Sequence, residues 1–337
     1  MAAMNYAPGY QADAERYDGR MEYRQCGNSG IQLPALSLGF WWNFGGINPL
    51  EESREKMLYA FDHGITCFDL ANNYGPPFGG AEETFGRVYR DNLRPYRHEM
   101  IVTTKAGYNM WEGPYGVGSS RKMLMTSIDE SLRRMGLDYV DIFYSHRYDE
   151  HTPIDETMQA LVDIVRQGKA LYVGLSNYPA DKLLYAAKYL RDSKVPCLIY
   201  QGKYNMTFRN VEEAILPALD REGIGFTAFC PVAQGILTDK YLHGIPADSR
   251  IAQGRYLKKD DIGEDVLRKV AALNDLALRR GQTLAQMAIA WLLANRSVTS
   301  VIIGTRTTEQ LKDNLGALEG CRFADDELAL IDTILKW

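Results

Sequence analysis

The sequence predicts an α/β fold, a (β/α)8 barrel of the TIM type with an N-terminal β-hairpin and extra helices. Short apolar segments, typical of buried strands, alternate with amphipathic segments that have helical spacing. Eight such strand segments occur, and each is followed by a helix, which favours a parallel sheet closed into a barrel. An open Rossmann-type sheet would need G-x-G-x-x-G after the first strand, but residues 40–46 read Phe-Trp-Trp-Asn-Phe-Gly-Gly.

The order of the elements follows from these periods. Residues 1–20 are polar and rich in Gly and Tyr, which predicts a flexible arm, and residues 21–337 are expected to form a single domain. A hairpin is predicted from 23–26 and 31–34, which flank Gly27-Asn28-Ser29-Gly30. Strands are expected over 35–39, 66–69, 100–104, 140–146, 171–175, 198–201, 225–229 and 298–303. Helices are expected over 51–63, 81–89, 119–135, 154–167, 180–191, 211–222, 264–280, 284–293, 309–318 and 325–336.

The composition excludes several classes of protein. Hydrophobic residues make up 46% and charged residues 24%, which is ordinary for a globular chain. The formal net charge is -5 and no basic run stands out, so a nucleic-acid or membrane surface is not expected. The five cysteines form no C-x-x-C pair and no apolar run is long enough to span a bilayer. Reduced thiols, no metal site and a cytoplasmic location are therefore predicted.

Chemically active side chains stand at or beside the ends of three predicted strands. The segment 66–69 ends on Asp69, the next strand is followed by Lys105, and the segment 140–146 ends on His146. Tyr74 follows Asp69 by five positions. Because the carboxyl ends of barrel strands share one face, these four groups are expected to converge.

The four groups suit carbonyl reduction. A tyrosine hydroxyl, with an ordinary pKa of about 10, is a weak acid, and Lys105 is expected to lower the pKa of Tyr74. Asp69 would keep Lys105 charged, and His146 could orient a hydrogen bond to the same carbonyl oxygen. No side chain can supply a hydride, so the chemistry calls for a nicotinamide cofactor.

Several motifs make the chain similar to the aldo-keto reductases over residues 21–337, in the branch with bacterial L-glyceraldehyde 3-phosphate reductases and potassium-channel beta subunits. The motifs occur in family order and at family spacing. They are residues 64–75 (Gly-Ile-Thr-Cys-Phe-Asp-Leu-Ala-Asn-Asn-Tyr-Gly), Ala81-Glu82-Glu83, Thr104-Lys105, Tyr139-Val140-Asp141, Ser145-His146-Arg147, Gly168-Lys169, Gly174-Leu175-Ser176-Asn177, Ile303-Gly304, Glu309-Gln310-Leu311 and Asn314.

The resemblance implies a role for each matching residue. Asp69, Tyr74, Lys105 and His146 match the catalytic tetrad, with the tyrosine as general acid. The expected NADPH contacts are Phe40 and Trp41 beside the nicotinamide, Asp69, Ser176, Asn177 and Gln201 at the carboxamide, Phe229 stacked on the ring, Cys230, Pro231, Val232, Leu237, Lys240 and Arg250 along the pyrophosphate, and Gly304, Arg306, Gln310, Asp313 and Asn314 at the adenosine phosphate. Trp41, Tyr74, Trp111, His146 and Arg147 are expected to contact substrate, and Arg121 is a further candidate for a phosphate partner.

The resemblance implies an NADPH-dependent reductase of small aldehydes, such as L-glyceraldehyde 3-phosphate or methylglyoxal, and a homo-oligomer, tetramer or octamer. Two departures matter: the channel subunits have asparagine at the position of His146, and many members have a basic residue at that of Gln310, which Arg306 would replace.

Other interpretations stay open at this point. One is a regulatory subunit that holds NADP with little turnover, and another is a Schiff-base aldolase with Lys105 as nucleophile. Ser176 and Asn177 could instead cap the next helix. The side chains of Trp41, Trp42 and Trp111 could simply pack the barrel mouth, and residues 113–118 are expected to form a mobile lid.

Overall fold

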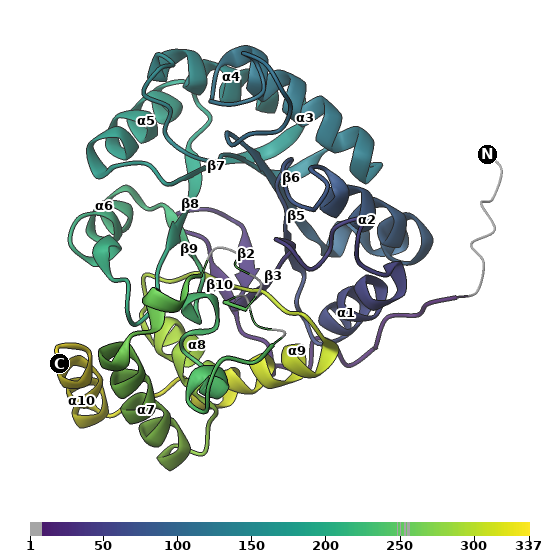
Figure 1. The fold of residues 1–337 in the computed structure, drawn as a ribbon. Coiled ribbons are helices and arrows are strands. Elements are labelled where there is room, and N and C mark those ends of the chain that lie inside the picture. Colours follow the sequence, from purple (N-terminus) through teal and green to yellow (C-terminus); the bar gives the residue numbers. More distant parts are fainter. Residues whose placement is uncertain (1–8, 248, 250, 253, 255–256) are drawn as a thin grey trace.

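Eight parallel strands close into a barrel in the computed structural model, which describes residues 9–247, 249, 251–252, 254 and 257–337 (Figure 1). Neighbouring strands pair in chain order, and the last strand pairs with both the one before it and the first, which closes the ring. The predicted (β/α)8 barrel is therefore confirmed. The barrel strands are β3 (Leu36–Gly39), β4 (Cys67–Asp69), β5 (Ile101–Ala106), β6 (Val140–Ser145), β7 (Ala170–Ser176), β8 (Cys197–Lys203), β9 (Gly225–Phe229) and β10 (Ser300–Ile303).

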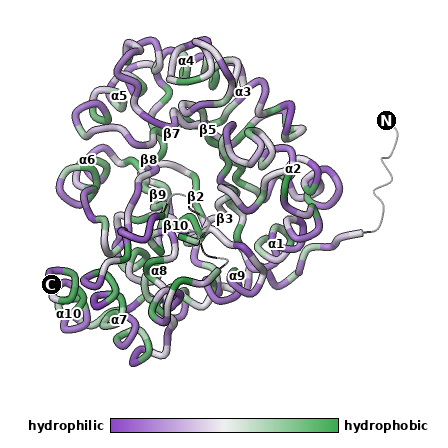
Figure 2. The backbone as a smooth tube through the Cα atoms, viewed as in Figure 1, coloured by the Kyte–Doolittle hydropathy of each residue, from purple (hydrophilic) through white to green (hydrophobic). Residues whose placement is uncertain are grey.

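Helices surround the barrel, and two of them, α7 and α10, lie side by side outside the ring (Figure 1). Figure 2 shows hydrophilic positions gathered on the outer turns of the helices, as expected where the inner face covers a sheet. The helices are α1 (Leu50–Asp62), α2 (Gly80–Val88), α3 (Arg121–Met135), α4 (Ile154–Arg166), α5 (Ala180–Asp192), α6 (Ile215–Glu222), α7 (Glu264–Arg279), α8 (Leu284–Ala294), α9 (Thr308–Leu315) and α10 (Asp325–Leu335).

Several observed helices and strands begin or end at other residues than predicted. The helix predicted over 211–222 is split into a 3-10 turn, Asn210–Glu212, and α6. A π-helix (Tyr89–Leu93) and a 3-10 helix (Arg94–Glu99) follow α2 directly, so helical structure continues beyond the predicted end at residue 89. Strand β5 continues to Ala106, so Lys105 lies inside a strand rather than after one. Further 3-10 turns span Ala233–Gly235, Asp239–Tyr241, Lys259–Ile262 and Gly316–Gly320.

The predicted hairpin closes the N-terminal end of the barrel. It consists of β1 (Tyr23–Gln25) and β2 (Gln32–Pro34), paired antiparallel. Cys26 and Leu33 pack against Cys67, Ile142 and Leu198, which lie in the first half of their strands. The hairpin therefore covers the end of the barrel opposite the carboxyl ends of the strands, which stay available for a site.

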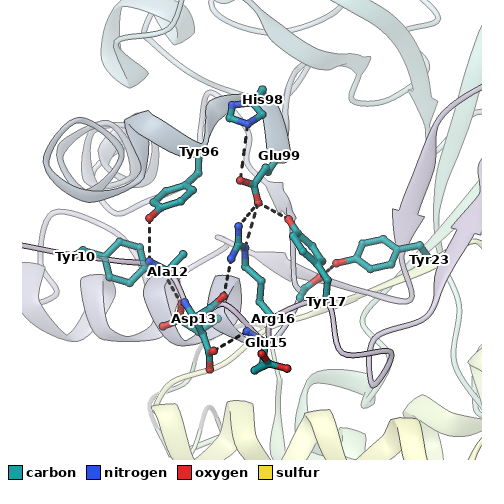
Figure 3. A network of polar contacts seen from close by, with 12 residues as sticks. Tyr10, Ala12, Asp13, Glu15, Arg16, Tyr17, Tyr23, Tyr96, His98 and Glu99 are labelled. Carbon is teal, nitrogen blue, oxygen red and sulfur yellow. Dashed lines mark hydrogen bonds and ion pairs between the residues drawn. The ribbon is translucent and has the colours of Figure 1, made fainter. Parts of the chain in front are cut away.

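Residues 9–20 are bound to the outside of the barrel (Figure 3). The Tyr10 hydroxyl donates to Asp62 at 2.7 Å, while Arg16 and Tyr17 both bond to Glu99, at 2.7 and 2.6 Å. For these residues the contacts disagree with a loosely held arm. Residues 1–8 lie outside the described residues, and the division into a flexible arm and one domain stays a prediction.

Candidate active site

The carboxyl ends of β4, β5 and β6 bring the four predicted catalytic side chains together. Asp69 is the last residue of β4, and Lys105 on β5 stands in register with Tyr144 on β6, two positions before His146. The Lys105 ammonium lies 2.6 Å from Asp69 Oδ2 and 5.1 Å from the centre of the Tyr74 ring. The Tyr74 and His146 rings are 5.9 Å apart. The expected convergence is what the geometry shows.

Lys105 and Asp69 form a buried ion pair at the centre of this site. Lys105 Nζ also donates to the Leu70 carbonyl at 2.6 Å, and Asp69 Oδ1 accepts from Thr103 and Gln201, each at 2.8 Å. Burial lowers the pKa of Lys105, while the charge of Asp69 raises it. Because each charge has several hydrogen-bond partners, the pair is held in one geometry.

An aromatic ring lies on another side of this ammonium. Tyr144 has its ring centre 5.7 Å from Lys105 Nζ. A Cβ atom on Gly174 of β7 would lie 2.4 Å from atoms of that ring. Glycine at 174 therefore makes room for the aromatic ring inside the barrel.

Tyr74 differs from expectation in its acidity. Burial and the negative charge of Asp69 raise the pKa of Tyr74 well above its ordinary value, whereas Lys105 was expected to lower it. The reason is geometric, since the ammonium is directed at Asp69 and Leu70 instead of the phenol oxygen. Tyr74 therefore keeps its proton across the physiological range.

His146 is uncharged, and one of its ring nitrogens lacks a hydrogen-bond partner among the described residues. Burial, together with the charges of Lys105 and Arg147, lowers the pKa of His146 well below its usual range. Its Nδ1 atom is buried and has no hydrogen-bond partner among the described residues. A buried ring nitrogen without a partner is costly unless a ligand or water binds there, which points to a ligand site.

Tyr108 is a site residue that the sequence did not reveal. Its ring centre lies 4.6 Å from that of His146, edge to face, and the Arg147 guanidinium carbon lies 5.1 Å from the same ring centre. The only sequence signal was its place three residues after Lys105.

The residues expected to hold the nicotinamide carboxamide lie at the ends of β7 and β8. Asn177 adopts a left-handed backbone (φ 54°), and its Nδ2 donates to the His146 carbonyl at 3.2 Å and to Ser176 Oγ at 3.1 Å. Helix α5 has Pro179 as its N-cap without a side-chain cap bond, so the capping alternative for Ser176 and Asn177 is wrong. Gln201 bonds to Asp69, which joins this group to the ion pair.

The segment after β9 holds the residues expected along the pyrophosphate. Phe229 ends β9, and Cys230, Ala233 and Gln234 have positive φ values of 59°, 47° and 61°. Non-glycine residues in this conformation cost free energy and cluster at ligand sites. Pro231, Val232 and Leu237 follow the same loop, Lys240 lies in the 3-10 turn Asp239–Tyr241, and the predicted contact Arg250 lies outside the described residues.

The residues expected at the adenosine phosphate gather after β10. Gly304 and Arg306 precede α9, whose N-cap is Thr307, and the Arg306 amide donates to Gln310 Oε1 at 2.8 Å. Asn314 is buried on the same helix, whereas the Asp313 carboxylate accepts from Thr283 and Gln286 at the start of α8. Asp313 is therefore occupied in joining two helices.

Two predicted contacts, Phe40 and Arg121, lie elsewhere than expected. The Phe40 side chain is fully buried, with its ring centre 4.3 Å from that of Phe44, so it packs in the barrel wall and not at the edge of the site. Arg121 pairs with Asp163 at 2.5 Å, which leaves it unsuited to a substrate phosphate. Trp41 packs against Trp42, and Trp111 is partly exposed in the loop after β5.

Arg147, which is expected to contact substrate, follows His146 directly in the chain. Its Nε donates to the Gly107 carbonyl at 3.2 Å, and no carboxylate of the described residues forms an ion pair with it. Its remaining N–H groups are therefore available beside His146.

Metal-binding clusters and membrane-spanning helices are both absent from the described residues. No group of three or more His, Cys, Asp or Glu side chains is arranged to hold a metal ion. No helix has both the length and the apolar character to cross a bilayer.

Comparisons with known proteins agree with this geometry. Residues 35–336 match the aldo/keto reductase family. The chain is 53% identical over 326 residues to the L-glyceraldehyde 3-phosphate reductase of Escherichia coli (strain K12), covering 95% of this chain and 94% of that protein. It is 38% identical over 304 residues to a probable voltage-gated potassium channel subunit beta of Arabidopsis thaliana, covering 89% and 92%. The chain therefore belongs to the aldo-keto reductase family, and it is an oxidoreductase of that family.

Proposed function

We propose that this protein is an NADPH-dependent reductase of small aldehydes, with Tyr74 as the general acid. The observation that carries the proposal is the convergence of a protonated tyrosine, a buried ion pair and a neutral histidine within one barrel end. Bound NADPH would supply a hydride to the carbonyl carbon. The substrate class is short aldehydes, including L-glyceraldehyde 3-phosphate, on which the Escherichia coli relative is named as acting, and methylglyoxal.

Each side chain has a definite part in this reaction. The Tyr74 hydroxyl donates its proton to the carbonyl oxygen as negative charge develops there. A high pKa of Tyr74 does not prevent this, because the alkoxide being formed is a stronger base than a phenolate. His146, being neutral, can donate an N–H hydrogen bond to the same oxygen without transferring its proton. The positive charge of Lys105, whose ammonium lies 5.1 Å from the centre of the Tyr74 ring, stabilises the phenolate left behind. The phenolate then regains a proton from water.

The loops around these groups suit a dinucleotide. Ser176, Asn177 and Gln201 present amide and hydroxyl groups at the ends of two strands, where a carboxamide could bind. The loop after Phe229 contains left-handed residues of the kind that cluster at ligand sites, and the N-terminus of α9 favours an anionic group such as a phosphate. Arg306 beside that helix supports a preference for NADPH over NADH.

A variant with phenylalanine at position 74 tests the proposal. Tyr74→Phe removes the proton donor and keeps the ring, so kcat for an aldehyde with NADPH should fall by about 10²- to 10⁴-fold. The assay is NADPH oxidation over a panel of aldehydes, with folding checked by circular dichroism. Tyr185→Phe, which alters an exposed tyrosine of α5, is the control and should keep parental activity. A Tyr74→Phe variant as fast as the parent would refute the proposal.

A second candidate is a regulatory subunit that binds NADP with little turnover, favoured by the similarity to plant channel subunits. His146, placed to orient a carbonyl, argues for the reductase. Sustained turnover separates the two, since a regulatory subunit would stop after one slow hydride transfer.

A Schiff-base aldolase fits the site poorly. Lys105 Nζ donates to Asp69 and to the Leu70 carbonyl and is fully buried, so its lone pair is not available for attack on a carbonyl. Borohydride trapping should therefore give no lysine adduct.

We further propose a cytoplasmic location and a homo-oligomer, tetramer or octamer. None of the five cysteines is joined in a disulfide, as expected in a reducing compartment.

A further inference from the structure

Tyr108 joins two side chains that have different parts in the proposed reaction. It contacts the imidazole of His146 and the guanidinium of Arg147, with centre-to-group distances of 4.6 and 5.1 Å. Tyr108 is 36% exposed, whereas His146 is 7% exposed, so the contact joins a surface residue to a buried one.

The backbone before Tyr108 explains this placement. The His146 amide donates to the Ala106 carbonyl at 2.9 Å, which aligns the end of β5 with the end of β6. Gly107 follows with φ +155°, and a Cβ there would lie 3.2 Å from His146 Cβ and 3.4 Å from the Arg147 nitrogen. Glycine at 107 therefore lets the ends of β5 and β6 lie close together, and this places the Tyr108 ring beside His146 and Arg147.

Arg147 is prepared for an anionic group. Only its Nε is bonded, to the Gly107 carbonyl, and within the described residues its other N–H groups have no partner. A guanidinium binds phosphate or carboxylate oxygens in pairs, and an aromatic ring beside it keeps it less hydrated. The group next to it in sequence, His146, is the proposed carbonyl-orienting residue.

The orientation of His146 depends largely on aromatic neighbours. Its Nδ1 has no hydrogen-bond partner among the described residues, and its aromatic neighbours are Tyr74 and Tyr108, with ring centres at 5.9 and 4.6 Å. A change in the position of the Tyr108 ring would therefore change the orientation of the His146 imidazole.

We propose that Tyr108 is a positioning residue which couples binding of a phosphate group by Arg147 to the orientation of His146 at the carbonyl. The inference rests on the proposed function and refines its substrate class to short aldehydes that carry a phosphate near the carbonyl. A phosphate that engages Arg147 fixes the guanidinium against the Tyr108 ring, and the ring in turn fixes the imidazole.

A double-mutant cycle on Tyr108 and Arg147 tests the coupling. The substrates are glyceraldehyde 3-phosphate and glyceraldehyde, each with NADPH. Arg147→Ala should raise KM for the phosphorylated aldehyde by about 10- to 100-fold more than for the unphosphorylated one. Tyr108→Leu, which removes both ring contacts, should lower kcat/KM for the phosphorylated aldehyde by about 10- to 50-fold and for the other by only a few-fold.

The coupling is read in the Arg147→Ala background. In that background Tyr108→Leu should lower kcat/KM by the same few-fold for both aldehydes, because Arg147 no longer binds the phosphate. Tyr108→Phe keeps the ring and should stay within about twofold of the parent. Equal losses for both aldehydes in both backgrounds would overturn the proposal, as would a Tyr108→Phe variant as impaired as Tyr108→Leu.

A second measurement does not need turnover. The ring resonances of His146 are followed by NMR while L-glycerol 3-phosphate, or inorganic phosphate, is added to the NADP-bound protein. His146 should shift in the parent but not in Tyr108→Leu or Arg147→Ala, with His63 and His98 as internal references. A shift without aldehyde reduction would refute the proposed function and support the coupling. Reduction without the shift would refute the coupling alone.

Discussion

His146 stays neutral because the barrel surrounds it with apolar contacts and two cations. Burial is the largest cause of its lowered pKa, and the charges of Lys105 and Arg147 add to it. A neutral imidazole can donate a hydrogen bond to a carbonyl oxygen without competing with Tyr74 for the transfer of the proton. The same environment makes stability depend on pH.

We predict that the parent loses stability as the pH falls below about 6.5, and that His146 causes part of this loss. The unfolded chain binds a proton at His146 below its ordinary pKa of about 6.5, whereas the folded state does not. Acid therefore favours the unfolded state, and between pH 7.5 and 5.5 this residue should remove about 1.4 kcal/mol from the free energy of unfolding.

Urea unfolding of the parent and His146→Gln at both pH values measures this effect. The variant should lose less stability on acidification, while His151→Gln, at an exposed position, should behave like the parent. Identical pH dependence in the parent and His146→Gln would contradict the prediction.

At the scale of elements, a buried carboxylate links α2, α3 and β5. Glu82 on α2 accepts from Thr104 Oγ1 at 2.6 Å and from Arg134 Nε at 2.7 Å, and it is fully buried. Thr104 stands directly before Lys105, so this link helps to fix the strand that carries the ammonium.

We predict that Glu82→Ala lowers the free energy of unfolding by about 3–5 kcal/mol. The change leaves the Arg134 guanidinium, only 10% exposed, without its nearest buried partner. Asp192→Ala, which breaks an exposed i,i+4 pair with Lys188, is the control and should cost less than about 1 kcal/mol. Denaturant midpoints measure both losses. Similar losses in the two variants would show that the buried contacts of Glu82 stabilise the fold no more than an exposed ion pair.

The contrast between Asp69 and Tyr108 shows which site residues could be predicted from the sequence and which could not. Asp69 was predictable because a short apolar run followed by polar residues marks a strand end, and strand ends share one face of a barrel. Tyr108 was not, because its position depends on Gly107 and on packing against residues 146 and 147, far along the chain. The predictions for Phe40 and Arg121 were wrong for the same reason. The burial of Phe40 and the ion pair between Arg121 and Asp163 both depend on tertiary contacts.

At the scale of the whole molecule, the segment before the barrel binds two elements that are distant in sequence from it. Tyr10 reaches the end of α1 at Asp62, and Arg16 and Tyr17 reach Glu99 at the end of the 3-10 helix (Figure 3). The Arg16 guanidinium also lies 5.6 Å from the centres of the Phe61 and Tyr96 rings. These contacts indicate that residues 9–20 unfold together with the barrel.

We predict that Glu99→Ala lowers the free energy of unfolding by about 1.5–3 kcal/mol, because it removes the shared acceptor of Arg16 and Tyr17. His98→Ala is the matched control: that side chain is 78% exposed, and its loss should change stability by less than about 0.5 kcal/mol. Urea unfolding gives the stability, and trypsin cleavage at Arg16 and Arg20 reports on the segment itself. If the segment belongs to the same cooperative unit as the barrel, Glu99→Ala shifts the unfolding midpoint and speeds cleavage together. Faster cleavage with an unchanged midpoint would instead show a locally detachable arm, which is the behaviour that composition alone predicted for residues 1–20.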